Sequence, residues 1–449
     1  MNFSDSERLS SFLENHQFKL AKKIKQADFV IFNTCGIRQT AEDRVYGQIH
    51  NLQKKNPEIR IILTGCLTHR KDVQKRLQDK VDLFCKIKDF QKIILPVISE
   101  DRISQQAKRV DGNSSIRDPE TYIKNTSLFN SKFKTQNSPY LSITPKYSSN
   151  FQANIPIMTG CNNFCSYCVV PYAREKEVSR PVKEIIQEIK KLVNKNYKEI
   201  TLLGQNVNSY AGKNEQNEII NFSQLLKKIN NISGEFWIRF VSSHPKDMSN
   251  ELIKTVTKLK KVCENIHLPI QSGDNIILKK MNRRYTSSYY LKLIKKIKKS
   301  FEKNKPKTIY SISADIIVGF PEETRKQFLA SAKIMEKVGY DMVYFGQFSP
   351  RPETVAWNMN DNITKKEKVD REKYLNEILK KSSLKNNKKY VGRTFDVLVE
   401  KNKDKFYYGK TRTAKNIKII KNQRNLIGKI IKVKIIKANI WNLEGTIDL

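Results

Sequence analysis

The chain has 449 residues, enough for two or three domains with at least one large core. Its 84 Lys and Arg against 45 Asp and Glu give a formal net charge of +39, which favours nucleic acid as a partner, although a general lysine bias would produce the same excess. No apolar run approaches the roughly 20 residues of a membrane span, and MNFSDSERLSSFLE lacks the features of a secretory signal. Seven cysteines in such a chain favour metal or redox chemistry in the cytoplasm over disulfides.

Residues 1–104 are predicted to form a small parallel α/β domain. Two apolar runs, ADFVIFNTC (27–35) and IRIILTGC (59–66), are typical of strands buried on both faces, and helical patterns lie between and after them. Cys35 and Cys66 each come just past the end of such a strand. Because ligands bind at this edge of parallel sheets, both thiols are candidate site residues.

The next two segments are a linker and a longer β/α region. Residues 105–146 are polar and rich in Ser, Asn and Lys, which predicts a linker. Within 147–380, strand-like runs alternate with helical segments; the runs are 154–159, 199–204, 236–241, 265–270, 312–320 and 342–348. Six β/α units predict a partial (β/α)6 barrel of the TIM type, whose site is expected at the carboxyl ends of the strands.

Residues 381–449 are predicted to form a small β-barrel. A basic helix over 366–389 precedes it, and short alternating strands follow from Tyr390, with Gly409 and Gly428 as expected turns. From Tyr390 to the end, the chain carries 14 Lys and Arg against 5 Asp and Glu. Small basic β-barrels often bind RNA, although a solvated β face in a lysine-rich protein has the same composition.

Three cysteines in MTGCNNFCSYCVVP (158–171) carry the most specific signal in the chain. Cys161, Cys165 and Cys168 have the spacing C-x3-C-x2-C directly after the first predicted barrel strand. Structural zinc usually takes four ligands, and a redox Cys-x-x-Cys pair would leave Cys161 idle. A [4Fe–4S] cluster normally takes four thiolates, so three protein ligands leave one iron free to bind a small molecule.

This spacing after a first barrel strand resembles the signature of radical S-adenosylmethionine enzymes. Further motifs extend the resemblance over essentially the whole chain to the MiaB-type methylthiotransferases, the tRNA 2-methylthio-N6-dimethylallyladenosine synthase family. They include FNTCGIRQTAEDRVYGQI (32–49), LLGQNVNSY (202–210), IRFVSSHPKD (238–247), MNRRYT (281–286) and SPRPETVA (349–356). The resemblance implies a methylthiotransferase domain, a radical barrel and a C-terminal TRAM domain.

The resemblance also implies the chemistry and the partners. Cys161, Cys165 and Cys168 would hold a [4Fe–4S] cluster that binds S-adenosylmethionine, whereas Cys35 and Cys66 would hold an auxiliary cluster that supplies sulfur. The expected reaction is methylthiolation at C2 of N6-(dimethylallyl)adenosine beside the anticodon of tRNA. We expect a monomer without a membrane partner that needs a reductant protein and a sulfur donor, neither identified by the sequence.

Contacts to S-adenosylmethionine are expected from four residues that match the family's positions, namely Tyr167, Gln205, Gln271 and Gly319. Each has a structural alternative, because an aromatic residue packs and a glycine near a strand end often marks a turn. No catalytic residue is assigned beyond the cluster ligands. Cys85, in VDLFCKIKD, and Cys263 are expected to be buried core thiols.

The chain departs from the family pattern in one place. The family's first auxiliary-cluster cysteine lies in a GCQMN motif, whereas this sequence begins MNFSDSERLS. Either the true start lies upstream of Met1, or a truncation weakens or removes the auxiliary cluster. Two alternatives to the main function therefore stay open: a methylthiotransferase acting on threonylcarbamoyladenosine tRNA or a ribosomal protein, and a truncated, non-thiolating Fe–S or zinc RNA-binding protein.

Overall fold

A computed structural model describes residues 1–36, 39–94, 140–420 and 425–448. Compact packing divides the chain into two units, one made of residues 1–148 with 172–175 and the other of residues 149–171 with 176–449. Most of the predicted linker, from 105 to 139, lies outside the described residues. Within the described part, no helix combines the length and the apolar character that a bilayer crossing requires.

The first unit has a three-stranded parallel sheet in the order β1-β2-β3 between two helical layers. Its elements are α1 (Asn2–Asn15), β1 (Phe29–Thr34), α2 (Gln39–Lys55), β2 (Arg60–Gly65), α3 (Lys71–Leu77) and β3 (Leu83–Cys85). Ile61 and Leu63 pack with α2 and α3 on one face, and Ile62 packs with α1 on the other. The sheet is therefore buried on both sides, as the two apolar runs predict.

The second unit contains six parallel strands that form a partial barrel. They are β4 (Gln152–Pro156), β7 (Glu199–Leu203), β10 (Trp237–Phe240), β11 (Asn265–His267), β12 (Ser311–Val318) and β13 (Met342–Gln347). Their order is β4-β7-β10 and β11-β12-β13, and a parallel bridge between Ile238 and Val262 joins the two groups. The predicted six-unit barrel is confirmed.

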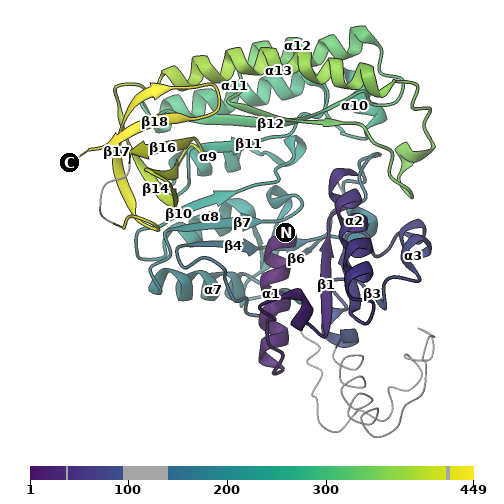
Figure 1. Ribbon diagram of the computed structural model, residues 1–449. Helices are drawn as coiled ribbons and strands as arrows, with labels where there is room; N and C mark the ends of the chain where they lie inside the picture. The colour runs from purple at the N-terminus through teal and green to yellow at the C-terminus, as the bar shows by residue number, and fades with distance from the viewer. Residues whose placement is uncertain (37–38, 95–139, 421–424, 449) are drawn as a thin grey trace, which may run out of the picture. The chain divides into compact units, whose positions relative to one another are not determined.

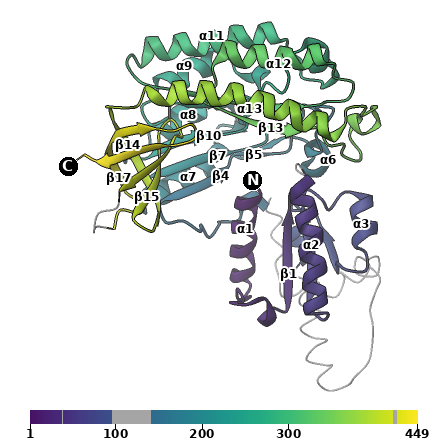
Figure 2. The same cartoon turned by 45° about the horizontal axis from the view of Figure 1, so that its top comes forward.

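Helices cover the outside of this partial barrel (Figures 1 and 2). They are α7 (Val182–Asn194), α8 (Phe222–Asn230), α9 (Asn250–Lys258), α10 (Asn275–Lys280), α11 (Ser287–Asn304), α12 (Arg325–Val338) and α13 (Lys365–Lys388). Short elements lie in the connections: α6 (Val170–Arg174), β5 (Met158–Thr159), β6 (Val178–Ser179), β8 (Ala211–Lys213) and β9 (Ile219–Asn221). Ile185, Ile189 and Leu192 form the buried stripe of α7, at the spacing of an amphipathic helix.

The end of the chain is a closed five-stranded barrel in the order β14-β15-β16-β18-β17. Its strands are β14 (Thr394–Lys403), β15 (Phe406–Thr411), β16 (Asn416–Ile420), β17 (Ile430–Ala438) and β18 (Leu443–Ile447). Gly428, with φ +78°, marks a turn as predicted. The turn predicted at Gly409 is wrong: this glycine lies within β15, where a Cβ would come 2.4 Å from the carbonyl oxygen of Leu398 on β14.

The loop between β15 and β16, residues 411–415, closes the amino-terminal end of the six-stranded barrel. Arg239 on β10 donates to the carbonyl oxygens of Arg412 (2.8 Å) and Thr411 (2.6 Å), and pairs with Glu199 at 2.5 Å. Arg412 in turn pairs with Glu264, the residue before β11, at 2.8 Å. Buried charges thus fix the small barrel to the starts of the strands, which leaves their carboxyl ends for a site.

Candidate functional site

The three clustered cysteines lie in a curled loop after β5, at the carboxyl end of the first barrel strand. Gly160 and Phe164, the residues before Cys161 and Cys165, have positive φ angles of +79° and +47°. Left-handed residues at these points bend the loop sharply. Cys161 and Cys165 are buried, each with 9% of its surface exposed, and Cys168 is half-buried.

The segment after α10 fastens this loop. The amide N–H of Ser166 donates to the carbonyl oxygen of Met281 (3.2 Å), and the Asn282 side chain donates to the carbonyl oxygen of the residue before Cys165 (2.9 Å). Arg283 Nη1 donates to the Cys165 sulfur at 3.4 Å. A guanidinium held this way stabilises negative charge on a thiolate, and hydrogen bonds to sulfur tune cluster potentials.

Arg283 is itself fixed on all sides. Its Nε donates to the hydroxyl of Tyr285 (2.9 Å), its Nη2 donates to the carbonyl oxygen of Pro269 (3.1 Å), and 4% of its surface is exposed. It belongs to the MNRRYT motif, but the sequence assigned it no role. The motif was the only sign in the sequence that Arg283 has a role. Its contact with Cys165 could not be predicted, because it joins residues 118 positions apart that closure of the barrel brings together.

The thiols suit a cluster better than a single ion. Burial, followed by the nearby charge of Cys165, raises the pKa of Cys168 to about 12, and burial also raises the pKa of Cys161. Cluster ligation must therefore displace protons from these sulfurs. No three His, Cys, Asp or Glu side chains of the described residues are grouped closely enough to hold one ion. A cubane distributes its thiolates over separate irons, so its ligands need not converge on one ion.

Buried polar atoms without a protein partner gather in the loops after β7 and β10, which are neighbouring strands. Within the described residues, no hydrogen bond reaches Gln205 Oε1, Asn206 Oδ1, Asn208 Oδ1, Ser243 Oγ or His244 Nε2. The amide N–H of Val207 donates to the carbonyl oxygen of Ser242 (3.1 Å), which ties the two loops together. Leaving such atoms unsatisfied costs about 1–3 kcal/mol each, so this edge is built to receive a polar ligand, and S-adenosylmethionine fits it.

His244 presents a neutral N–H to this site. Its Nδ1 accepts from the amide N–H of Lys246 (3.3 Å), so the ring proton lies on Nε2, the atom without a partner. Burial, followed by the charge of Arg283, lowers the pKa of His244 to about 2. The imidazole therefore stays neutral and can donate one hydrogen bond to a ligand.

The four predicted cofactor contacts have different surroundings. Gln205 lies in the group of unpartnered atoms, and Tyr167 packs against an apolar cluster that contains Phe320 and Phe348. Gln271 bridges to β12 through its backbone, with φ +72°. Gly319 has φ +68°, and a Cβ there would meet Lys368 Cγ at 2.4 Å, so close packing already requires a glycine.

In the first unit, Cys35 and Cys66 share one edge of the sheet. Each comes one residue after the paired strand ends Thr34 and Gly65, and the amide N–H of Cys66 donates to the carbonyl oxygen of Thr34 (2.9 Å). Gly65 has φ +92°, and a Cβ would come 2.4 Å from that same carbonyl oxygen. The close contact between the two strand ends places Cys35 and Cys66 at the same edge of the sheet.

A fixed positive charge lies near Cys66. Arg174 pairs with buried Asp5 at 2.5 Å, and the charges of Asp5 and Cys66 outweigh burial and raise the pKa of Arg174. Cys85 is different: it lies in the apolar core with 1% exposed, and burial raises its pKa to about 12, as expected of a core thiol.

Three family models match the chain. Residues 1–86 match the "Uncharacterized protein family UPF0004", residues 155–335 match the "Radical SAM superfamily", and residues 388–447 match the "TRAM domain". Among solved structures, the fold is similar to the radical S-adenosylmethionine methyltransferase TsrM from Kitasatospora setae, with a TM-score of 0.54 at 13% identity over 79% of this chain and 72% of that one.

Curated relatives match over almost the full length. A tRNA-2-methylthio-N(6)-dimethylallyladenosine synthase from Finegoldia magna is 38% identical over 99% of this chain and 92% of its own. Synthases of the same name from Thermoanaerobacter pseudethanolicus and Clostridium tetani are 39% and 40% identical, over 90% and 93% of their own lengths. The chain therefore contains a domain of the radical SAM superfamily and belongs to the tRNA-2-methylthio-N(6)-dimethylallyladenosine synthase family.

Proposed function

We propose that the protein methylthiolates C2 of N6-(dimethylallyl)adenosine next to the anticodon of tRNA. The observation that carries this proposal is 38–40% identity over 99% of the chain to synthases of that product. The cysteine loop at the carboxyl end of the first barrel strand and the polar atoms after β7 and β10 support it. Their chemistry suits S-adenosylmethionine, which carries an amino group, a carboxylate and ribose hydroxyls.

In this proposal Cys161, Cys165 and Cys168 hold a [4Fe–4S] cluster, and Arg283 holds Cys165 in place through its N–H···S contact. When bound, the cluster and S-adenosylmethionine supply the radical that removes hydrogen from the substrate carbon. The chain's own part is positional. His244 donates its N–H, Gln205 offers an acceptor oxygen, and Tyr167 provides a half-buried aromatic wall.

Cys35 and Cys66 are proposed ligands of the auxiliary cluster that supplies sulfur, with Arg174 balancing its negative charge. Iron content tests the number of clusters in the reconstituted protein, since two cubanes bring about eight irons per chain and one brings about four. In the Cys35→Ala variant we expect a fall of about four irons. An unchanged iron content in that variant would rule Cys35 out as a ligand.

The proposal retains the predicted domain limits of 1–104, 105–146, 147–380 and 381–449. The C-terminal barrel binds tRNA through its lysines and arginines, largely without regard to sequence. The protein acts as a monomer in the cytoplasm, where a reducing environment keeps its seven cysteines free of disulfides. A reductant and a sulfur source act with it.

Anaerobic reconstitution followed by nucleoside mass spectrometry tests the function. With S-adenosylmethionine, a chemical reductant and tRNA carrying N6-(dimethylallyl)adenosine, we expect the 2-methylthio nucleoside together with 5′-deoxyadenosine. Transfer RNA carrying threonylcarbamoyladenosine is the matched control and should remain unmodified. Product from the control tRNA alone would assign the chain to the alternative substrate, and 5′-deoxyadenosine without any methylthio product would indicate a non-thiolating enzyme.

A further inference from the structure

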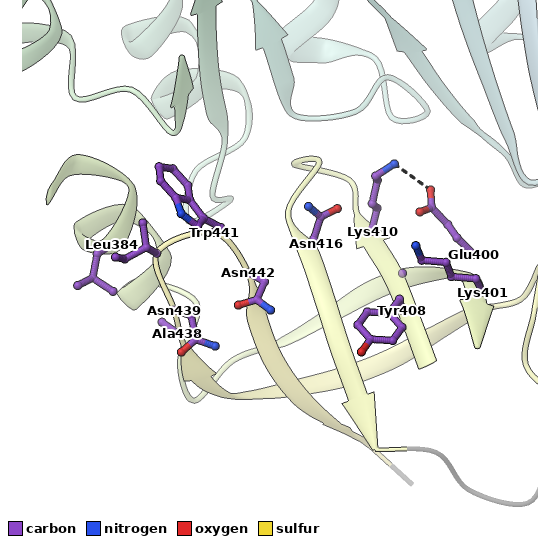
Figure 3. Close-up of a pocket in the computed structure, with 12 residues that line it drawn as sticks. Leu384, Glu400, Lys401, Tyr408, Lys410, Asn416, Ala438, Asn439, Trp441 and Asn442 are labelled. Atoms are coloured by element: carbon purple, nitrogen blue, oxygen red, sulfur yellow. Dashed lines mark hydrogen bonds and ion pairs between the residues drawn. The ribbon is translucent and has the colours of Figure 1, made fainter. Parts of the chain in front are cut away.

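A cavity of about 940 Å³, lined by both polar and apolar side chains, opens on the C-terminal barrel. Figure 3 shows Trp441 and Leu384 on one side, Tyr408, Lys401, Lys410 and Asn416 on the other, and Asn442 between them. Its volume lies within the roughly 300–1,000 Å³ range of ligand pockets.

The loop that carries Trp441 is held in place by hydrogen bonds, and the indole on it faces solvent. Residues 439–442 join β17 to β18, and two side chains of α13 hold them. Ser383 Oγ donates to the carbonyl oxygen of Ile440 (2.7 Å), and Asn387 Nδ2 donates to the carbonyl oxygen of Asn439 (2.7 Å). Both donors are buried, with 2% and 1% exposed, whereas Trp441 is 42% exposed. A rigidly presented, solvent-facing indole is a ready stacking surface.

The charge around the cavity suits an anionic partner. Lys401 and Lys410 line it, and Lys410 pairs with Glu400 at 3.1 Å, so the cavity's carboxylate is already neutralised. The Lys401 ammonium also lies 5.8 Å from the centre of the Tyr408 ring. The amides of Asn416 and Asn442 add donors and acceptors that can meet the edge of a base.

We propose that this cavity binds one unpaired nucleotide of the tRNA, with its base stacked on Trp441 and its phosphate near Lys401 and Lys410. The proposal rests on the proposed function, because it takes the RNA partner from there. Aromatic residues interleaved with lysines form the usual platform for single-stranded nucleic acid. The cavity thus adds a fixed point of contact to the sequence-independent attraction of the basic surface.

The nucleotide in the cavity differs from the one that is modified. The small barrel is fixed to the starts of the parallel strands through residues 411–415, and Cys161 follows the ends of the strands. The eight residues of β12 span about 26 Å, which separates the two positions by more than one nucleotide. The tRNA must therefore extend from the modified adenosine to a second unpaired position.

Binding of full-length unmodified tRNA by Trp441→Ala at several salt concentrations tests the stacking. Loss of a base–aromatic stack weakens binding by roughly 5- to 150-fold, and the dependence of log Kd on log[salt] should keep its slope because no phosphate contact is lost. Trp441→Phe should recover much of the affinity. Ile436→Ala removes an exposed apolar side chain of β17 outside the cavity and serves as the matched control.

Replacing a cavity lysine should change the salt dependence of binding, whereas replacing Trp441 should not. Lys401→Ala should reduce the salt slope by about one, whereas Lys434→Ala removes an exposed lysine of β17 outside the cavity and serves as the control for non-specific charge. Binding of the anticodon stem-loop alone shows where the second unpaired position lies: a loss with Trp441→Ala there places it within the loop, and a loss seen only with full-length tRNA places it elsewhere.

Thermal unfolding checks that each variant is folded. Unchanged tRNA affinity in a folded Trp441→Ala protein overturns the proposal and would leave the cavity to another partner, such as a peptide. Formation of 5′-deoxyadenosine and of the methylthio nucleoside is measured in parallel: failure of these reactions with intact, Trp441-dependent tRNA binding counts against the proposed function and not against the cavity.

Discussion

At the scale of single residues, sulfur atoms with similar burial have different surroundings. Cys165 receives an N–H from Arg283, whereas Cys263 lies in an apolar cluster with Trp237 and Leu398, where burial raises its pKa to about 11. Burial alone therefore does not mark a ligand. The bent loop and the N–H donors directed at Cys161 and Cys165 are what distinguish these thiols from Cys263.

The first prediction follows from this difference. Cys161→Ala, Cys165→Ala and Cys168→Ala should each abolish cleavage of S-adenosylmethionine, because each removes a proposed ligand of the cluster that binds it. Cys263→Ala is the control and should retain cleavage. The measurement is 5′-deoxyadenosine by liquid chromatography after anaerobic reconstitution. Cleavage that persists in any of the three loop variants would show that this cluster is not where the cofactor reacts.

The second prediction concerns His244 and acidity. Its pKa falls from 6.5 to about 2 on folding, so between these values the unfolded chain binds a proton that the folded chain does not. The free energy of unfolding should therefore decrease as the pH falls below 6.5, with up to about 1.4 kcal/mol per pH unit from this residue. His244→Asn should lack that contribution.

Urea unfolding of the metal-free protein between about pH 5 and pH 7 measures this difference. Subtracting the variant's profile from that of the unchanged protein removes the contribution of the carboxylates, which both share. Parallel profiles for the two proteins would mean that His244 titrates normally and is not the buried neutral donor described above.

At the scale of elements, turns carry constraints that residue type alone does not reveal. Gly319 and Gly339 both follow regular elements with nearly equal φ angles of +68° and +66°. A Cβ at Gly339 would meet nothing within 4 Å, whereas one at Gly319 would meet Lys368, whose ammonium is anchored on Asp361 at 2.7 Å. Comparing substitutions at the two glycines therefore separates the free-energy cost of a left-handed backbone from the cost of close packing.

The third prediction uses this pair. Gly339→Ala should lose about 1–2 kcal/mol of stability from the left-handed backbone, and Gly319→Ala should lose about 1–3 kcal/mol more because Lys368 must move. Denaturant unfolding of both metal-free variants gives the comparison. Equal losses of stability in the two variants would show that Lys368 moves aside at little cost. Packing would then not explain the glycine at position 319, and the cofactor contact predicted from the sequence would be the remaining explanation.

Much of the element order could be predicted because burial leaves a periodic pattern in the sequence. The strands found at β1, β2 and β7 lie within the predicted runs, and Cys35, Cys66 and Cys161 follow strand ends as expected. The local sequence pattern gave a wrong prediction at Gly409, because the backbone of Leu398 on a neighbouring strand lies too close to allow a Cβ there. The unpartnered atoms of Asn206 and Ser243 were also missed, because only barrel closure buries them.

At the scale of the whole molecule, the second unit depends on charges buried between its two barrels. The Arg239 guanidinium has 11% of its side chain exposed and Glu199 has 8%. Breaking such a pair leaves one charge buried and unbalanced, which costs about 3–5 kcal/mol. An exposed pair such as Lys227 and Glu251 contributes at most about 1 kcal/mol.

The fourth prediction compares these two pairs. Arg239→Met should lower the stability of the second unit by about 3–5 kcal/mol, whereas Lys227→Met should change it by less than about 1 kcal/mol. Trp237 reports the change by fluorescence, because the Arg239 guanidinium lies 5.5 Å from its ring centre. If the two variants unfold at the same urea concentration, the two barrels are not held together by this pair.

The loop that closes the barrel also limits how this protein can be recombined. Arg412 reaches Glu264 and the carbonyl oxygens of Lys260 and Val262, so its partners lie in the other barrel. A C-terminal module exchanged with that of a relative would bring its own residue to position 412 while Glu264 stayed behind. The two barrels therefore depend on each other through this contact, and a chimaera should need both sides of it from one parent.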